Sequence, residues 1–182
     1  MFKLSRQVGD DWRPFSHPPV FAEETLSTGD LRLCATVPGG DPQVAATLVE
    51  GLEGPFQLLY VLHTPRGEGA PGRYQSEDME GAEVQDFLRA YADLLRSDGR
   101  FDLWIRAEGS GTLLVWDRHD HLFVYGALSR AAERLRGLGF ADGVSPPPVP
   151  HAHHYRAEND AQAARLLASR SWRVTPLHPG DE

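Results

Sequence analysis

Histidines are the residues whose type and spacing in this sequence best suit metal chemistry. His119 and His121 follow Asp117, and His151 and His153 stand in the segment PHAHHY. Because side chains alternate between the two faces of an extended chain, residues two apart point to the same side. Neutral imidazole nitrogens bind zinc and other transition metals. If the two segments meet in the fold, they supply three or four ligands for a divalent transition metal such as zinc.

A structural explanation of the same histidines competes with this one, and we favour it. Their spacing matches no closed zinc signature, and no pair of cysteines accompanies them. Histidines that lie in polar turns, or that are partly buried and hydrogen-bonded, would account for the same residues. If a metal does bind, we expect His151 and His153 as ligands with His119 or His121, whereas His154 points away. Imidazoles more than about 8 Å apart cannot share one ion at zinc–nitrogen distances of about 2.0–2.1 Å.

Residues 64–78 form the longest polar loop that the sequence predicts. The segment contains three glycines and two prolines, with Arg66 and Arg73 on either side of the glycines. Backbone amides and the two guanidinium groups would suit an anion-binding loop. The Gly-Lys-Ser/Thr ending of a P-loop is missing, so a mobile surface loop is the favoured interpretation and an anion site at Arg66 and Arg73 the alternative.

Cys34 is the single cysteine of the chain, so it has no partner for an intramolecular disulfide. It stands within an alternating strand pattern, where a small packed side chain is expected and a catalytic thiolate is not. No basic segment followed by an apolar run of signal-peptide length opens the sequence, and no apolar run reaches the roughly 18 residues of a membrane-spanning helix. These features predict a soluble, cytoplasmic protein.

The charge of the chain limits its partners. A formal net charge of −8 disfavours nucleic acids and anionic membranes as partners. It would steer a basic protein toward this one, and a homo-oligomer is a further possibility. Lys3 is the single lysine among 18 basic residues, and such a bias toward arginine reflects a GC-rich genome more than phosphate recognition.

Helices and strands are expected to mix without regular alternation. The predicted strands are residues 31–37, 56–62, 101–107, 112–116, 122–125 and 172–177. The predicted helices are residues 41–52, 84–95 and 128–138, with another beginning near Asn159. Residues 56–62 are almost entirely apolar, which predicts a central strand buried on both faces, with Leu59 and Val61 almost fully buried.

At 182 residues, with 41% hydrophobic and 24% charged residues, one globular domain spanning residues 1–182 is expected. The fold class is α+β, with helices packed on a largely antiparallel mixed sheet. Residues 1–28 have scattered aromatic residues and three prolines, which predicts an irregular N-terminal arm.

Three motifs of the C-terminal half, DGRFDLW, LVWDRH and PHAHHY, resemble those of a family of hypothetical bacterial proteins. That family carries no assigned activity, so the resemblance implies a bacterial origin and no catalytic residue. The favoured function is therefore a non-enzymatic binding or protein-interaction domain, with no cofactor. The alternative is a metal-assisted hydrolase, in which the metal held by the histidines activates water and Asp117 acts as the base.

Overall fold

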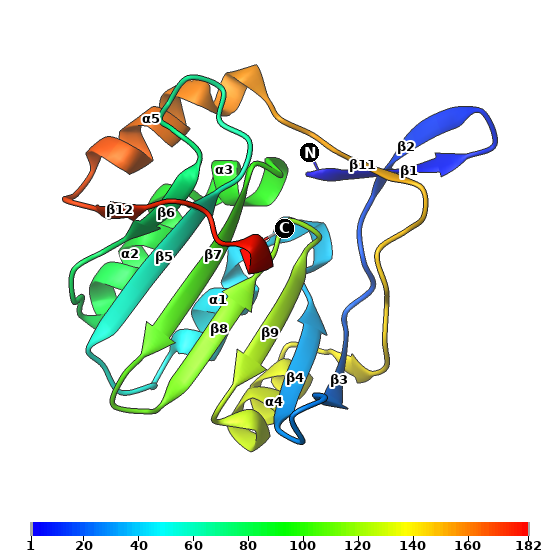
Figure 1. Cartoon of the computed structure of the whole chain (residues 1–182). Coiled ribbons are helices and arrows are strands. Elements are labelled where there is room, and N and C mark those ends of the chain that lie inside the picture. Colours follow the sequence, from blue (N-terminus) through cyan, green and yellow to red (C-terminus); the bar gives the residue numbers. More distant parts are fainter. Residues whose placement is uncertain (1, 182) are drawn as a thin grey trace.

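The computed structural model describes residues 2–181 and shows an α+β fold (Figure 1). Within these residues the strands form a large sheet of nine strands, in the order β10-β3-β4-β9-β8-β7-β5-β6-β12, and a small sheet of three, in the order β11-β1-β2. Neighbouring strands are antiparallel except for β10 and β3. The strands are β1 (Leu4–Val8), β2 (Asp11–Phe15), β3 (Val20–Thr25), β4 (Leu31–Thr36), β5 (Phe56–Leu62), β6 (Gly72–Gln75), β7 (Phe101–Ala107), β8 (Thr112–Trp116), β9 (His121–Tyr125), β10 (Ala141–Asp142), β11 (His151–His153) and β12 (Arg173–Thr175).

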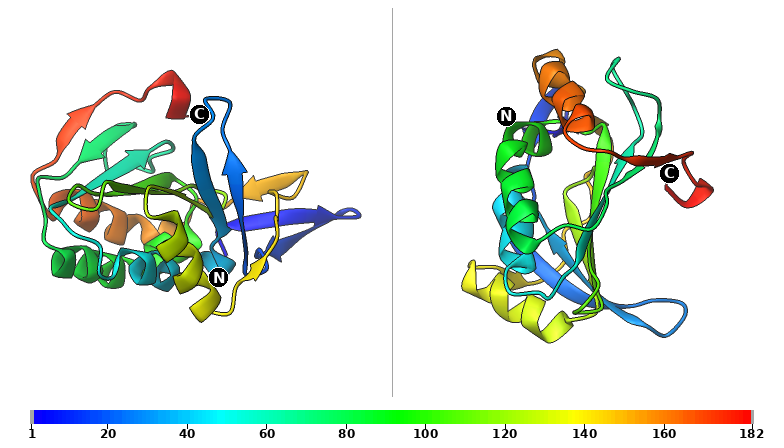
Figure 2. Two further views of the ribbon diagram at one scale, coloured as in Figure 1. Left: turned by 90° about the horizontal axis from the view of Figure 1, so that it is seen from below. Right: turned by 90° about the vertical axis from the view of Figure 1, so that its left-hand side faces the viewer.

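The helices cover one face of the large sheet, and the C-terminal segment crosses to the other side (Figure 2). The helices are α1 (Pro42–Val49), α2 (Gly81–Ala90), α3 (Ala92–Ser97), α4 (Leu128–Gly137) and α5 (Asp160–Ala168). The side chain of Asp41 caps α1 by accepting the Gln43 amide, and Pro42 begins the helix as expected. The predicted helix over residues 84–95 is divided in two at Tyr91, whose φ of −110° leaves the helical range.

Residues 56–62 form β5, an interior strand between β7 and β6, as predicted. Val61 is fully buried, as predicted, but Leu59, on the same face of the strand, is half-buried, so the prediction of almost complete burial is wrong for Leu59. The reason is that the helices pack against one face of the sheet. Leu59 lies on the opposite face, hereafter the open face, in a row with Trp104, Val115 and Phe123.

The predicted irregular arm over residues 1–28 is also wrong, because β1, β2 and β3 fall within it. β3 pairs with β4 in the large sheet, and β1 forms a hairpin with β2. The pattern was hard to recognise because much of the β1–β2 hairpin is exposed and shows no apolar alternation. β1 also pairs with β11, which lies almost 150 residues further along the chain.

No helix in the described part of the chain is long and apolar enough to cross a membrane.

Candidate functional site

Three of the four predicted histidine ligands lie together between the two sheets. His119 is in the turn between β8 and β9, whereas His151 and His153 are on β11. The ring centroids are 5.1 Å apart for His119 and His151, 4.8 Å for His119 and His153, and 5.2 Å for His151 and His153. One ring nitrogen of each lies within 4.8 Å of the others. The two segments therefore meet well within the 8 Å limit set from the sequence, and we call these three residues the histidine cluster.

His121 is not part of the cluster. Its Nε2 donates to the Ser145 carbonyl oxygen at 2.8 Å, and its ring packs against His17 with a centroid separation of 4.7 Å. His17 Nε2 donates to the His119 carbonyl oxygen at 3.0 Å, so its Nδ1 accepts from the Ser145 hydroxyl at 2.9 Å. Burial, and then the neighbouring His121, lower the pKa of His17 to about 4, so this ring is neutral at pH 7. His17 and His121 together hold the segment around Ser145.

Asp117, the predicted base of the hydrolase alternative, is already engaged by the turn. Its Oδ1 accepts the backbone N–H groups of His119 and His121 at 2.9 and 2.8 Å. Its Oδ2 lies 3.4 Å from Nδ1 of His119 and 3.9 Å from Nδ1 of His121. The bonds from the two histidines, which outweigh the effect of burial, lower the pKa of Asp117. This carboxylate therefore orients the turn and its histidines through Oδ1, while Oδ2 faces the two imidazole rings.

The structure does not bring Arg66 and Arg73 together around one anion site. Arg66 pairs with Asp160 at 3.0 Å, and Arg73 pairs with Asp181 of the C-terminal segment at 2.7 Å. The predicted loop over residues 64–78 is also more ordered than expected, because β6 occupies part of it. Each guanidinium group already has a carboxylate partner, which leaves the anion-binding alternative without support.

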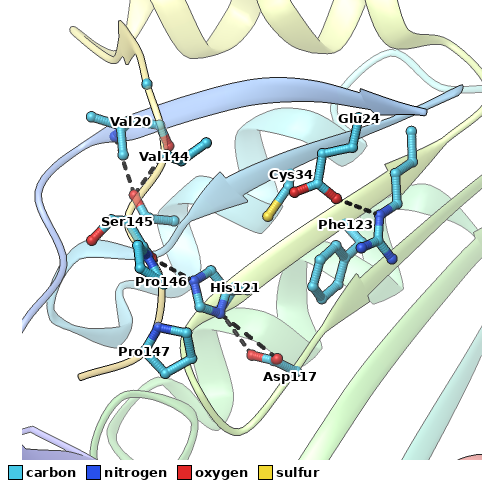
Figure 3. Close-up of a pocket in the computed structure, with 13 residues that line it drawn as sticks. Val20, Glu24, Cys34, Asp117, His121, Phe123, Val144, Ser145, Pro146 and Pro147 are labelled. Carbon is cyan, nitrogen blue, oxygen red and sulfur yellow. Dashed lines mark hydrogen bonds and ion pairs between the residues drawn. The ribbon is translucent and has the colours of Figure 1, made fainter. Parts of the chain in front are cut away.

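A cavity of about 420 Å³ lies on the open face, between strands β3, β4 and β9 and the segment 143–147 (Figure 3). Phe123 and Cys34 contribute to its floor, and Pro146 and Pro147 to its wall. The remaining lining residues are Val20, Glu24, Arg32, Thr36, Asp117, His121, Gly143, Val144 and Ser145. The wall is in place because His121 and His17 bind Ser145, so the histidine missing from the cluster shapes this cavity instead.

Arg32 and Glu24, which line the cavity, neutralise each other, and the third charged residue of the lining, Asp117, accepts two amides of its own turn. The guanidinium group of Arg32 lies over the ring of Phe123 at 4.3 Å, and its Nε donates to Glu24 at 2.8 Å. It also donates to the Tyr125 hydroxyl at 3.2 Å. Thr36 donates to the Pro18 carbonyl at 2.6 Å and accepts the Val20 amide at 3.2 Å. The cavity therefore offers apolar contacts and few free charges.

The thiol of Cys34 faces this cavity (Figure 3) and is half-buried. Burial, and then the negative charge of Glu24, raise its pKa to about 12. The side chain is therefore a neutral thiol at pH 7.

We expect Cys34 in the folded protein to react with iodoacetamide at pH 8 about a thousandfold more slowly than a free thiol of pKa 8.5, because so little thiolate is present. The rate should rise about tenfold per pH unit from pH 8 to 10, where a free thiol approaches its plateau. Alkylation followed by mass spectrometry measures both rates, and the urea-unfolded chain is the control. A folded-state rate equal to that of the unfolded chain would contradict the assigned environment.

The cavity and the role of His17 were missed in the sequence. Position 17 stands alone among prolines and shows no spacing to another histidine, so no pattern marks it. The Pro-rich segment after residue 143 was recognised as stiff and extended, but which surface it covers depends on contacts far along the chain. Cys34 and Phe123 lie on strand faces that mix apolar and polar residues, and this mixture was the one sign in the sequence that helices do not cover that face of the sheet.

In comparisons with known proteins, no family model, no curated protein and no solved structure matches this chain.

Proposed function

We propose that this protein is a non-enzymatic binding domain whose ligand is a small, uncharged and largely apolar molecule held in the cavity beside Phe123. The observation that carries the proposal is the cavity itself. Its volume of about 420 Å³ falls in the range of small-molecule sites, roughly 300–1,000 Å³. Such sites combine apolar walls with a few polar groups, and this lining has that composition.

The charge pattern of the lining selects for a neutral ligand. Arg32 is already paired with Glu24 and stacked on Phe123, so an anionic ligand would have to displace Glu24 from the guanidinium group. A cation would compete with Arg32 for Glu24 in the same way. Affinity would then come from burial of apolar surface, at about 25 cal/mol per Å².

A basic protein partner, which the net charge of −8 favours, stays a prediction. The hydrolase alternative loses support, because the Asp117 carboxylate, its predicted base, already accepts two backbone amides of the turn. Binding without catalysis is therefore the function that the geometry supports best.

The test uses the neutral fluorescent probe N-phenyl-1-naphthylamine. We expect its fluorescence to rise on saturable binding to the folded protein, since the cavity shields it from water. Cys34→Leu adds two non-hydrogen atoms to the floor of the cavity and should weaken binding by about tenfold, equivalent to about 1.4 kcal/mol. The matched control is Leu59→Phe, which adds volume to the same face of the sheet outside the cavity.

Competition by candidate ligands against the bound probe then identifies their chemical class. If the probe does not bind, or if Leu59→Phe weakens it as much as Cys34→Leu does, the cavity is not the binding site and the proposed function is wrong.

A further inference from the structure

The histidine cluster carries an inference that is independent of the cavity. We propose that His119, His151 and His153 together bind one divalent transition-metal ion of the zinc class. The residues come from two segments more than 30 positions apart, and the fold brings their rings into a nearly equilateral triangle with centroid separations of 4.8–5.2 Å.

The backbone explains why these side chains converge. β11 is held in register by β1, with His153 opposite Leu4 and His151 opposite Arg6, so the two histidines share one face of the strand. On the other side, Asp117 shapes the turn that carries His119. Asp120, in the same turn, adopts a left-handed φ of 61°. Both segments are therefore held in place before any ion arrives, β11 by backbone pairing with β1 and the turn by the side chain of Asp117.

Two of the rings face polar partners of the kind that zinc-binding histidines have. Nδ1 of His151 lies 2.8 Å from the Pro148 carbonyl oxygen, and because a carbonyl can only accept, this nitrogen carries the proton. Nε2 of the neutral ring then has its lone pair free for a metal. Nδ1 of His119 lies 3.4 Å from the Asp117 carboxylate, a longer contact in which the carboxylate can likewise only accept. Such carboxylate and carbonyl partners fix the tautomer and orientation of ligand histidines.

His153 provides an independent indication. Its Nδ1 is buried and has no hydrogen-bond partner among the described residues. A buried polar group without a partner costs about 1–3 kcal/mol. The ring also packs closely on Gly99, where an added Cβ would lie 2.9 Å from Nδ1 and 3.1 Å from Cβ of His153. The glycine at position 99 therefore makes space for the His153 ring, but none of the described residues offers its Nδ1 a hydrogen-bond partner.

The donor set determines the class of ion. Three imidazoles suit zinc, cobalt, nickel and copper, whereas magnesium and calcium require oxygen ligands. Tetrahedral zinc places its nitrogen ligands about 3.3 Å apart, so the nitrogens, now within 4.8 Å of one another, would close by at most about 1.5 Å. Side-chain rotation achieves this, since all three residues are only half-buried. A fourth position stays open to solvent or to a further ligand.

The experiment uses the full chain without an affinity tag, freed of metal by a chelator and titrated with Zn²⁺ by calorimetry and with Co²⁺ by visible absorption. We expect one equivalent of either ion to bind, with the d–d bands of four-coordinate cobalt. His119→Ala, His151→Ala and His153→Ala should each abolish stoichiometric binding. The matched control is His154→Ala, which removes the next histidine of the segment. The ring of that histidine bonds to Ser5 at 2.6 Å instead of joining the cluster.

Two further variants test how the site is positioned. Asp117→Asn keeps an oxygen for the turn amides but loses the negative charge beside His119, and we expect about 10–100-fold weaker binding. Gly99→Ala should also weaken binding, because the added methyl group displaces the ring of His153. Circular dichroism of each variant establishes that it is folded.

A measurement on the unaltered protein does not depend on any variant folding. Zn²⁺ should protect His119, His151 and His153 from diethyl pyrocarbonate, as mapped by mass spectrometry, and leave His178 reactive. The proposal is overturned if no ion binds at one equivalent. It is equally overturned if the three alanine variants bind as the unaltered protein does, or if His154→Ala loses the ion as they do.

Discussion

Replacing Arg100 by leucine is expected to lower the free energy of unfolding by about 3–5 kcal/mol, because the change leaves buried carboxylates without their cation. Arg100 is fully buried. Its Nε and Nη2 donate to the two oxygens of Asp98, each at 2.8 Å, and its Nη1 donates to Glu68 at 2.9 Å. Both carboxylates are themselves almost fully buried, so water cannot replace the lost guanidinium group.

The same side chain connects distant parts of the chain. Nη2 of Arg100 also reaches Asp160 at the start of α5 and the Arg156 carbonyl oxygen, at 3.0 and 2.9 Å. Loss of the side chain should therefore loosen the 64–72 loop and α5 together. Urea unfolding followed by circular dichroism measures the effect.

The control for this substitution is Arg106→Leu, which removes an exposed pair with Glu108 and should change stability by less than about 1 kcal/mol. Arg100→Lys should fall between the two, since it keeps the charge but loses the paired contact with Asp98. An Arg100→Leu effect as small as that of Arg106→Leu would contradict the role assigned to this network.

Lys3→Met is expected to lower the free energy of unfolding by about 3–5 kcal/mol, because it also leaves a buried carboxylate without its cation. Nζ of Lys3 is fully buried, lies 2.9 Å from Asp120 Oδ1, and sits over the ring of Trp116 at 4.4 Å. Asp120 in turn accepts the Trp116 Nε1–H at 3.1 Å. The substitution would leave the carboxylate of Asp120 buried without a cation, beneath the hairpin that Lys3 anchors.

A double variant separates the lost charge pair from lost packing. In Lys3→Met with Asp120→Asn, the amide of asparagine still accepts from Trp116 and tolerates the φ of 61° at this position. We expect at least half of the lost stability to return, as measured by urea unfolding with tryptophan fluorescence. The control is removal of the exposed ion pair between Arg13 and Asp11 by the corresponding substitutions. No recovery in the double variant would mean that packing of Lys3, and not charge, stabilises this region.

Local patterns in the sequence identified most elements of the large sheet. The alternation at residues 31–37, the apolar run at 56–62 and the three short strands from 101 to 125 all became strands, because each segment has to bury its own apolar side chains against the core. The same reasoning predicted that Leu59 is almost fully buried, whereas it is half-buried. An apolar run indicates burial but does not show whether helices cover one face of a sheet or both.

The sequence by itself determined the α+β class, the positions of the helices and central strands, and the pairing of His151 with His153 on one face of an extended segment. Only the tertiary structure decided that His119 joins them while His121 turns to Ser145, and that Arg66 and Arg73 have separate carboxylate partners. The physical reason is that periodicity reports local burial, whereas convergence depends on long-range pairing. β11 reaches the histidine cluster because it pairs with β1 at the opposite end of the chain.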